Sequence, residues 1–164
     1  GCQTLSEPGL TRPVVAPVSS TLGSPVSFIT ASDSNARIGS TIVIAANVAP
    51  ASDGGGIAAF RARLGYDASA LEYVAEVPVS GMMRALNSQP NEVIVAGATA
   101  TPTTNPQLFA LQFRVRASNA LSGLTLVIDE LSDAGYSSQL KFLTPLPLVR
   151  VDRSLSQSQV GSAK

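Results

Sequence analysis

The residues of this chain that could take part in chemistry are mainly carboxylates. The 164 residues contain no histidine and no tryptophan, and the single cysteine is Cys2. This composition excludes Ser-His-Asp and Cys-His catalytic relays, histidine-containing metal sites and an internal disulfide. The carboxylates open to general acid-base chemistry are Asp67, Glu72, Glu92, Asp129, Glu130 and Asp133. We therefore expect a protein that is not an enzyme.

Two acidic runs could offer oxygen ligands to a calcium ion, which binds six to eight oxygen atoms. One is Asp53 with the three glycines after it, and the other is Asp129-Glu130 with Asp133. Neither run has the regular ligand spacing of a known calcium loop. The sequence therefore predicts no metal and no cofactor, with calcium as the alternative.

The charge balance limits the kinds of partner. Eleven basic residues match eleven acidic ones, so no general positive field attracts a phosphate backbone. The strongest apolar run, Ile42–Ala46, has the length of a strand and is too short to span a bilayer. We expect no nucleic-acid partner and no membrane-spanning helix.

The start of the sequence resembles a processed bacterial lipoprotein. Gly1-Cys2-Gln3 precedes a stretch with spaced prolines, Pro8, Pro13 and Pro17. The resemblance implies that Cys2 carries lipid and is the only link to a membrane. Residues 1–24 would be an extended tether, and the protein would be an extracytoplasmic lipoprotein of the outer membrane or cell surface. A chance exposed thiol is the alternative.

Residues 25–153 carry the pattern of a folded β domain, and residues 154–164 that of a flexible tail. Alternation with a period of two predicts strands over 41–48, 57–66, 71–77 and 108–116, and shorter strands over 27–30, 93–98, 124–128 and 146–151. A helical turn is expected only over 82–86, with Met82 and Met83 packed beneath the connection. The predicted inward residues are Ile42, Ile44, Ala46, Val48, Phe60, Ala62, Leu64, Tyr66, Leu71, Tyr73, Ala75, Val77, Phe109, Leu111, Phe113 and Val115. Many short strands between Gly, Pro and Asn turns indicate an all-β sandwich.

The segment Gly65–Val74 predicts a corner between two strands. Tyr66 ends an inward face, so its ring belongs to the core. Asp67 is placed to accept hydrogen bonds from the amides of Ser69 and Ala70 in an Asx-type turn. Tyr66, Asp67 and Leu71 are therefore interpreted as structural residues.

This corner and its flanks resemble bacterial cohesin domains, which bind proteins. The resemblance extends from Ala36 to Val151 and includes the segments 37–44, 65–74, 108–115 and 133–136. It implies a nine-stranded β-sandwich with jelly-roll topology. It also implies a non-catalytic module that binds a dockerin or dockerin-like partner on the sheet formed by the eighth, third, sixth and fifth strands of the family.

Combined with the alternation, the resemblance predicts a binding face rich in arginine. The outward residues Arg61 and Arg63 are expected beside a second outward set, Gln112, Arg114 and Arg116. Arginine suits protein interfaces because it forms paired hydrogen bonds and flat contacts, so the partner would be an acidic surface protein. The alternative is a solvated face on which each arginine pairs with acids such as Glu72 or Asp129.

Two other functions stay open. A carbohydrate-binding module shares this architecture but needs exposed aromatic rings. Tyr66 and Tyr73 alternate toward the core, which leaves Tyr136 as the only plausible sugar platform. A structural lipoprotein subunit of a surface or secretion assembly is the third possibility.

Overall fold

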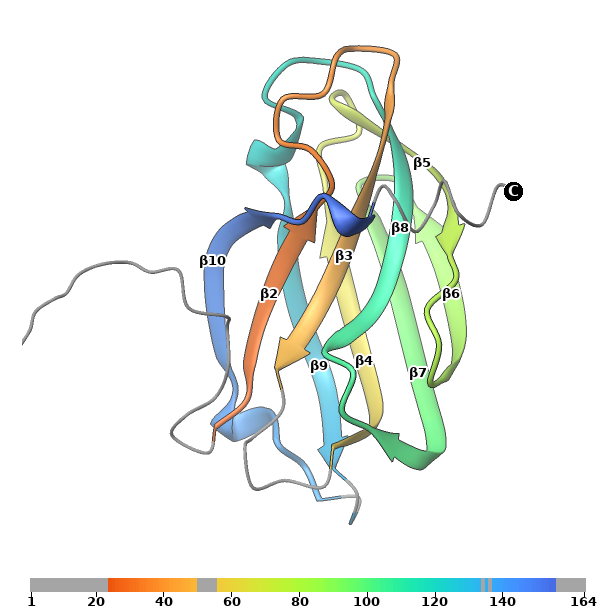
Figure 1. Ribbon diagram of the computed structural model, residues 1–164, viewed down its shortest axis with the longest axis vertical. Helices are drawn as coiled ribbons and strands as arrows, with labels where there is room; N and C mark the ends of the chain where they lie inside the picture. The colour runs from red at the N-terminus through yellow and green to blue at the C-terminus, as the bar shows by residue number, and fades with distance from the viewer. Residues whose placement is uncertain (1–23, 50–55, 134, 136, 156–164) are drawn as a thin grey trace, which may run out of the picture.

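The computed structural model describes residues 24–49, 56–133, 135 and 137–155. In this part of the chain, strands form two sheets packed face to face, as Figure 1 shows. The strands are β2 (Val26–Ala31), β3 (Thr41–Ala49), β4 (Ile57–Gly65), β5 (Leu71–Val77), β6 (Met83–Gln89), β7 (Glu92–Thr103), β8 (Gln107–Val115), β9 (Thr125–Asp133) and β10 (Thr144–Val151). Two short 3-10 helices, η2 (Ala120–Gly123) and η3 (Leu140–Phe142), flank β9. The predicted nine-stranded β-sandwich is confirmed.

The chain passes repeatedly from one sheet to the other. The five-stranded sheet has the order β10-β2-β3-β8-β5, and the four-stranded sheet has the order β6-β7-β4-β9. All neighbouring strands are antiparallel except β10 and β2, which run parallel. β4 therefore lies between β7 and β9, whereas β8 lies in the opposite sheet between β3 and β5.

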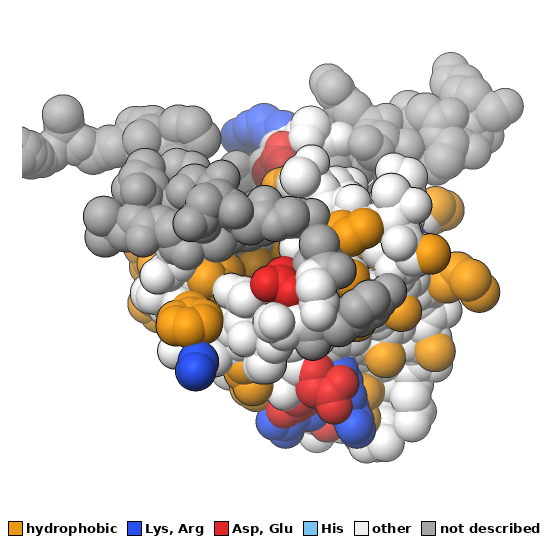
Figure 2. Space-filling model, turned by 90° about the horizontal axis from the view of Figure 1, so that it is seen from below, with side chains coloured by type: hydrophobic (Ala, Val, Ile, Leu, Met, Phe, Trp, Pro, Cys, Tyr) orange, Lys and Arg blue, Asp and Glu red, His pale blue; other side chains and the backbone are white. Residues whose placement is uncertain are grey.

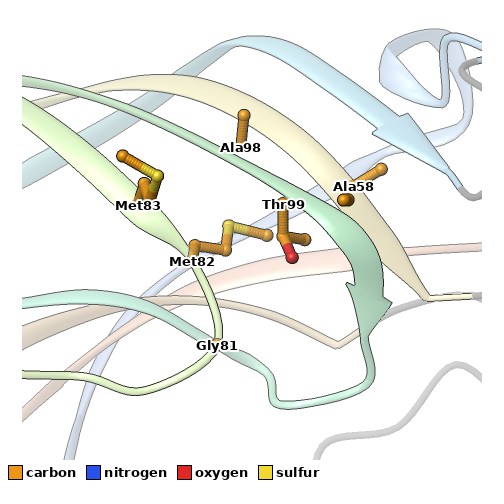
Figure 3. Close-up of a pocket in the computed structure, with 7 residues that line it drawn as sticks. Ala58, Gly81, Met82, Met83, Ala98 and Thr99 are labelled. Carbon is orange, nitrogen blue, oxygen red and sulfur yellow. The ribbon is translucent and has the colours of Figure 1, made fainter.

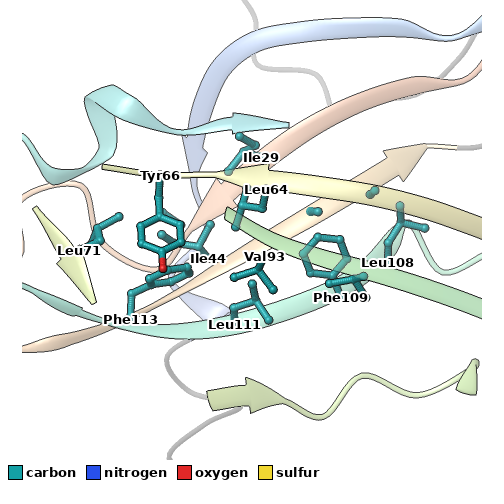
Figure 4. Close-up of a cluster of buried hydrophobic side chains, with 14 of the residues drawn as sticks. Ile29, Ile44, Leu64, Tyr66, Leu71, Val93, Leu108, Phe109, Leu111 and Phe113 are labelled. Atoms are coloured by element: carbon teal, nitrogen blue, oxygen red, sulfur yellow. The ribbon is translucent and has the colours of Figure 1, made fainter. Parts of the chain in front are cut away.

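The core lies between the two sheets and follows the alternation of the sequence. The predicted inward residues of β3, β4 and β8 all belong to it, and Phe109 and Phe113 are fully buried (Figure 4). The rings of Phe60 and Phe109 stack with centroids 6.0 Å apart. Tyr66 meets Phe113 edge-on at 5.0 Å. These contacts join β4 of one sheet to β8 of the other.

β5 departs from the predicted phase because of a bulge. Its register against β8 shifts between Tyr73 and Ala75. Before the shift, Leu71 is fully buried and Tyr73 packs against Phe113 in the core. After it, Val77 belongs to a different apolar cluster. The prediction that Ala75 and Val77 continue the inward face of Leu71 is therefore wrong, because one extra residue reverses the faces of a strand.

That second cluster covers the outer face of the five-stranded sheet. Val43 and Ala45 alternate with the inward residues of β3 and so point away from the core. They are nevertheless fully buried, because the segment after β5 and the segment after β10 pack on them. The cluster consists of Val43, Ala45, Val77, Val79, Ala110 and Leu155. Leu155 is 5% exposed, so the folded part continues past the predicted boundary at Arg153.

The segment after β5 also differs from the prediction. Residues 83–89 form strand β6 and not a helical turn, and all seven pair with β7 without a break in register. Met83 is 84% exposed, so the expectation that it packs beneath the connection is wrong; Met82 is partly buried against the core. Local sequence favoured a turn, but pairing with β7 gives these residues a ladder of backbone hydrogen bonds.

The corner after β4 is held by burial of its tyrosine and by hydrogen bonds of its aspartate. Tyr66 is buried, and burial raises the pKa of its phenol. Asp67 Oδ1 accepts hydrogen bonds from the amide of Ser69 at 2.9 Å and from its hydroxyl at 2.6 Å. These bonds hold the pKa of Asp67 below its usual value. The amide of Ala70 instead donates to the backbone carbonyl of Asp67, so the side chain makes only one of the two expected backbone contacts.

Candidate functional site

The predicted arginine-rich face is divided between the two sheets. Arg61 and Arg63 lie on β4, whose neighbours are β7 and β9. Gln112 and Arg114 lie on β8, and Arg116 follows it, in the five-stranded sheet. The prediction that these five residues share a face is therefore wrong. It expected the strand over residues 108–116 beside β4, but the neighbours of β4 are β7 and β9.

The arginines of β4 take part in an ion-paired network. Arg63 donates two hydrogen bonds to the carboxylate of Asp129, one of 2.8 Å from Nε and one of 3.0 Å from Nη2. Its Nη1 also lies 3.8 Å from Glu92. The hydrogen bond from Arg63 holds the pKa of Asp129 below its ordinary value, and the same bond raises the pKa of Arg63. Arg63 therefore already has a partner within the chain.

A bulge in β9 supplies the acids of this network. The register between β4 and β9 shifts next to Arg61, and Ile128 and Leu131 are both buried although they are three residues apart. The extra residue turns Asp129 and Glu130 together away from the core. Glu130 is the cross-strand neighbour of Arg61. The face thus carries acids as well as bases and is not a positive patch.

The polar residues of β8 form a separate and looser group. Arg116 makes one ion pair with Glu72 of β5 at 2.8 Å, and both side chains are about half exposed. Exposed pairs of this kind contribute little to stability. Arg114 is exposed, and Gln112 lies half-buried between its cross-strand neighbours Val43 and Ala75. The pairing of Arg63 with Asp129 and of Arg116 with Glu72 agrees with the alternative of individually paired arginines.

The outward side chains of β6, β7, β4 and β9 form a surface that we call the four-stranded face. Its half on β6 and β7 is apolar and consists mostly of small residues. Across the whole face, from β6 through β7 and β4 to β9, neighbouring residues form three rows. These rows are Met83–Ala98–Ala59, Ala85–Ala96–Arg61–Glu130 and Asn87–Ile94–Arg63–Val127. Ala85, Ala96 and Ala98 are exposed, as is Met83. The result is a flat apolar area on β6 and β7 beside the charged network on β4 and β9.

A shallow groove lies at the end of this apolar area, where β6 begins. Figure 3 shows the side chain of Met82 next to Thr99, with Met83 and Ala98 on the adjoining strands. The groove is lined by Ala58, Gly81, Met82, Met83, Ala98, Thr99 and Ala100. Gly81 has a φ of 110°, which suits glycine and lets the chain turn into β6. The lining consists of methyl and thioether groups and the side chain of Thr99, so the groove mainly offers apolar contact to a partner.

The two sheets differ in how open their outer faces are. The five-stranded sheet is covered across β3 and β8 by the cluster that includes Leu155. In the four-stranded sheet, the outward residues of β6 and the middle of β7 are mostly exposed. Figure 2 shows a region of apolar side chains on the right and a compact group of acidic and basic side chains at the lower edge. Among the described residues, the centre of the five-stranded sheet is thus covered, whereas β6 and the middle of β7 in the four-stranded sheet are not.

The remaining predicted site residues have other places. Cys2, Asp53 and Tyr136 lie outside the described residues. Asp133 does not join Asp129 in a metal site: its oxygens accept hydrogen bonds from the amides of Gly135 and Ser137 and from the side chain of Gln139. Among the described residues no three acids, cysteines or histidines are grouped to hold a metal.

Sequence reasoning missed Met83, Ala85, Ala96 and Ala98. The alternation of Met83, Ala85, Asn87 and Gln89 is a weak strand signal that could have identified β6, but alanine and polar residues do not distinguish an open face from a loop.

The helices in the described part of the chain are all too short to cross a membrane.

Comparison with solved structures identifies the architecture. No family model and no curated protein matches the sequence. The sixth cohesin of scaffoldin B from Acetivibrio cellulolyticus, solved in complex with a dockerin, has a TM-score of 0.56 at 17% identity, and the match covers 77% of this chain and 99% of that one. A non-cellulosomal cohesin from the archaeon Archaeoglobus fulgidus has a TM-score of 0.54 at 20% identity, covering 82% and 96%.

A cohesin–dockerin complex from Clostridium thermocellum gives the same result. Its TM-score is 0.55 at 13% identity, with 81% of this chain and 94% of that chain covered. The described domain therefore has the fold of cohesin domains, in agreement with the resemblance found in the sequence.

Proposed function

We propose that this chain is a non-catalytic protein-binding module that holds its partner against the four-stranded face. The observation that carries the proposal is the difference between the two sheets: among the described residues, apolar side chains cover β3 and β8 of one sheet, whereas β6 and the middle of β7 in the other stay exposed. Several solved structures with this fold are complexes with dockerins. A dockerin-like protein is therefore the first class of partner to test.

The composition of the face defines what its partner must offer. Met83, Ala85, Ala96 and Ala98 form a flat area that lets another backbone approach closely. Arg61 lies at the border of this area beside Glu130. Because Arg63 is paired with Asp129, the face gives no reason to expect a strongly acidic partner. We propose an apolar contact surface on the partner with a polar rim, as in typical interfaces.

Sugar binding has less support in this fold. Tyr66 and Tyr73 both pack edge-on against Phe113, with ring centroids at 5.0 Å and 5.9 Å. Rings held in this way cannot form a sugar platform, and Tyr136, the predicted platform residue, lies outside the described residues. The acylation of Cys2 and the extracytoplasmic location stay predictions. Loss of a Cys2→Ser variant from the membrane fraction would test the acylation, and protease digestion of intact cells would test the location.

The test of the proposed function uses one variant on each sheet. The 164-residue chain is immobilised and incubated with envelope extract of the source bacterium, and retained proteins are identified by mass spectrometry. Ala98→Glu places a charge in the apolar area, whereas Arg114→Glu changes an exposed residue of the other sheet. We expect Ala98→Glu to lose the protein that the wild type retains and Arg114→Glu to keep it. Retention by both variants would refute the face assignment.

A further inference from the structure

β6 forms a free edge of the four-stranded sheet. It pairs with β7 on one side and with no described strand on the other. Beyond that ladder, its backbone makes one further hydrogen bond within the described residues, from the Tyr66 hydroxyl to the Gln89 carbonyl at 3.4 Å. A free edge of this kind presents N–H and C=O groups that can pair with another strand.

The other three edge strands carry features that prevent such pairing. β10 contains Pro145 and Pro147, and its register against β2 is broken between Pro145 and Val149. β9 has the bulge that turns Asp129 and Glu130 outward. β5 has its own bulge and carries Glu72 and Glu76. Prolines, bulges and charges are the usual protection of sheet edges.

β6 has none of these features. Its seven residues pair with β7 in unbroken register and include no proline. Its one charged residue, Arg84, is turned inward with a side chain only 9% exposed, and it is paired with Glu76 at 2.9 Å. The outward residues are uncharged: Met83, Ala85, Asn87 and Gln89. Among the described residues, β6 is therefore the edge strand that carries none of the features that oppose addition of a strand.

We propose that β6 pairs with β6 of a second copy of this chain, antiparallel and centred on Leu86. In this register Met83 lies opposite Gln89, and Ala85 lies opposite Asn87. Arg84 lies opposite Ser88, so no two like charges meet across the pair. The chain also has a formal net charge of zero, so two copies do not repel each other at long range. In this register the backbone groups of the two edges can pair, and no charge on either strand opposes the pairing.

The dimer joins two four-stranded sheets into one continuous sheet. The exposed side chain of Met83 gains a neighbour across the new pair, and both four-stranded faces open to the same side. One short strand pair buries little surface, so the dimer is weak and its population depends on concentration. A dimer of this kind would present two partner-binding faces together and raise the apparent affinity for a partner with repeated modules.

The association is tested on the chain alone, so its outcome is independent of the proposed partner. Sedimentation velocity of the 164-residue chain from about 1 µM to about 1 mM covers the range expected for a weak dimer. We expect a reversible dimer in the wild type. Ala85→Lys places a charge on the exposed side of the edge strand and is expected to remain monomeric, with an unchanged circular dichroism spectrum and melting temperature.

Leu148→Lys is the matched control. Leu148 is 75% exposed on β10, the edge of the other sheet, and this variant is expected to dimerise like the wild type. A wild type that stays monomeric at every concentration overturns the proposal. So does dimerisation of Ala85→Lys, or loss of the dimer in Leu148→Lys alone.

The register is tested by cross-linking in a Cys2→Ser background. Because Ala85 lies opposite Asn87 of the other copy, the double variant Ala85→Cys with Asn87→Cys is expected to form a covalent dimer under mild oxidation. Leu148→Cys in the same background sets the level of random collision. Cross-linking of the double variant no faster than that level contradicts pairing through β6.

Discussion

Arg63 and Asp129 join β4 to β9 through two hydrogen bonds of 2.8 Å and 3.0 Å on the outer side of the four-stranded sheet. The pair exists because a bulge turns Asp129 outward toward the arginine. It gives Arg63 the kind of acidic partner that the alternative interpretation of a solvated face expected. The proposed contact with a partner therefore rests more on the apolar area on β6 and β7 than on the arginines of this sheet.

The first prediction concerns the pH dependence of this pair. The folded protein lowers the pKa of Asp129, so its contribution to stability is present above the ordinary carboxyl pKa of about 3.9 and is lost as the pH falls through the lower folded value. We expect Arg63→Gln to reduce the urea midpoint at pH 7 and to approach the wild type in strong acid. Arg61→Gln, which removes no described ion pair, serves as the control and should show a smaller change with pH. An equal loss for Arg63→Gln at both pH values would contradict the account.

The second prediction concerns the packing of Gly97 against Phe60. A Cβ atom at Gly97 would lie 2.3 Å from Cε1 of Phe60, whose ring is held in the core by stacking on Phe109. Overpacking of this kind costs about 1–3 kcal/mol. We expect Gly97→Ala to lose about that much stability in urea unfolding. In a Phe60→Leu background, Gly97→Ala should cost less than it does in the wild type, because the smaller side chain leaves room for the Cβ atom. The exposed neighbour change Ala96→Ser should be nearly neutral.

The third prediction concerns the C-terminal segment. Leu155 is buried against Val43, Ala45 and Ala110 on the outer face of the five-stranded sheet. A chain that ends at Arg153 should lose about 2 kcal/mol of stability relative to one that ends at Leu155, since a buried leucine is removed. It should also bind more of an apolar fluorescent dye. Equal stability of the two chains would show that Leu155 does not hold this cover in place.

The fourth prediction concerns Arg84, which lies between the edges of the two sheets. Its side chain is 9% exposed, donates from Nε to Glu76 at 2.9 Å and also donates to the carbonyl of Val79. Removal of Glu76 alone leaves a buried charge without its counter-ion. We expect Glu76→Gln to cost about 1–3 kcal/mol and the double variant Glu76→Gln with Arg84→Met to cost less. A larger loss in the double variant would argue against this explanation.

The sequence predicted the phase of strands where a large apolar side chain occupies every second position. Phe60, Leu64, Phe109 and Phe113 are inward as expected, because misplacing them would expose large rings and aliphatic groups to water. Local alternation carries no information on which strands are neighbours. The predicted position of residues 108–116 beside β4 rests on the strand order that the cohesin resemblance implies, and it is wrong because these residues match a strand of the opposite sheet.

Two further features could not be read from local pattern. The bulge at Tyr73–Ala75 changes the faces of β5 without changing the alternation of its sequence. Residues 83–89 are polar or small and become a strand through pairing with β7. The four-stranded face depends on both the sheet order and this strand. The sequence therefore indicated the correct fold and placed Arg61 and Arg63 on this face, but it wrongly added the residues of β8 to them.

The central claim is that the four-stranded face holds the partner. The most direct measurement is the dissociation constant of the retained partner for the wild type, Ala98→Glu and Arg114→Glu, obtained by surface plasmon resonance with folded, monodisperse protein. The account predicts at least about a tenfold weakening for Ala98→Glu, equivalent to about 1.4 kcal/mol, and wild-type affinity for Arg114→Glu. Wild-type affinity for Ala98→Glu together with loss of binding for Arg114→Glu would place the partner on the five-stranded sheet and contradict the account.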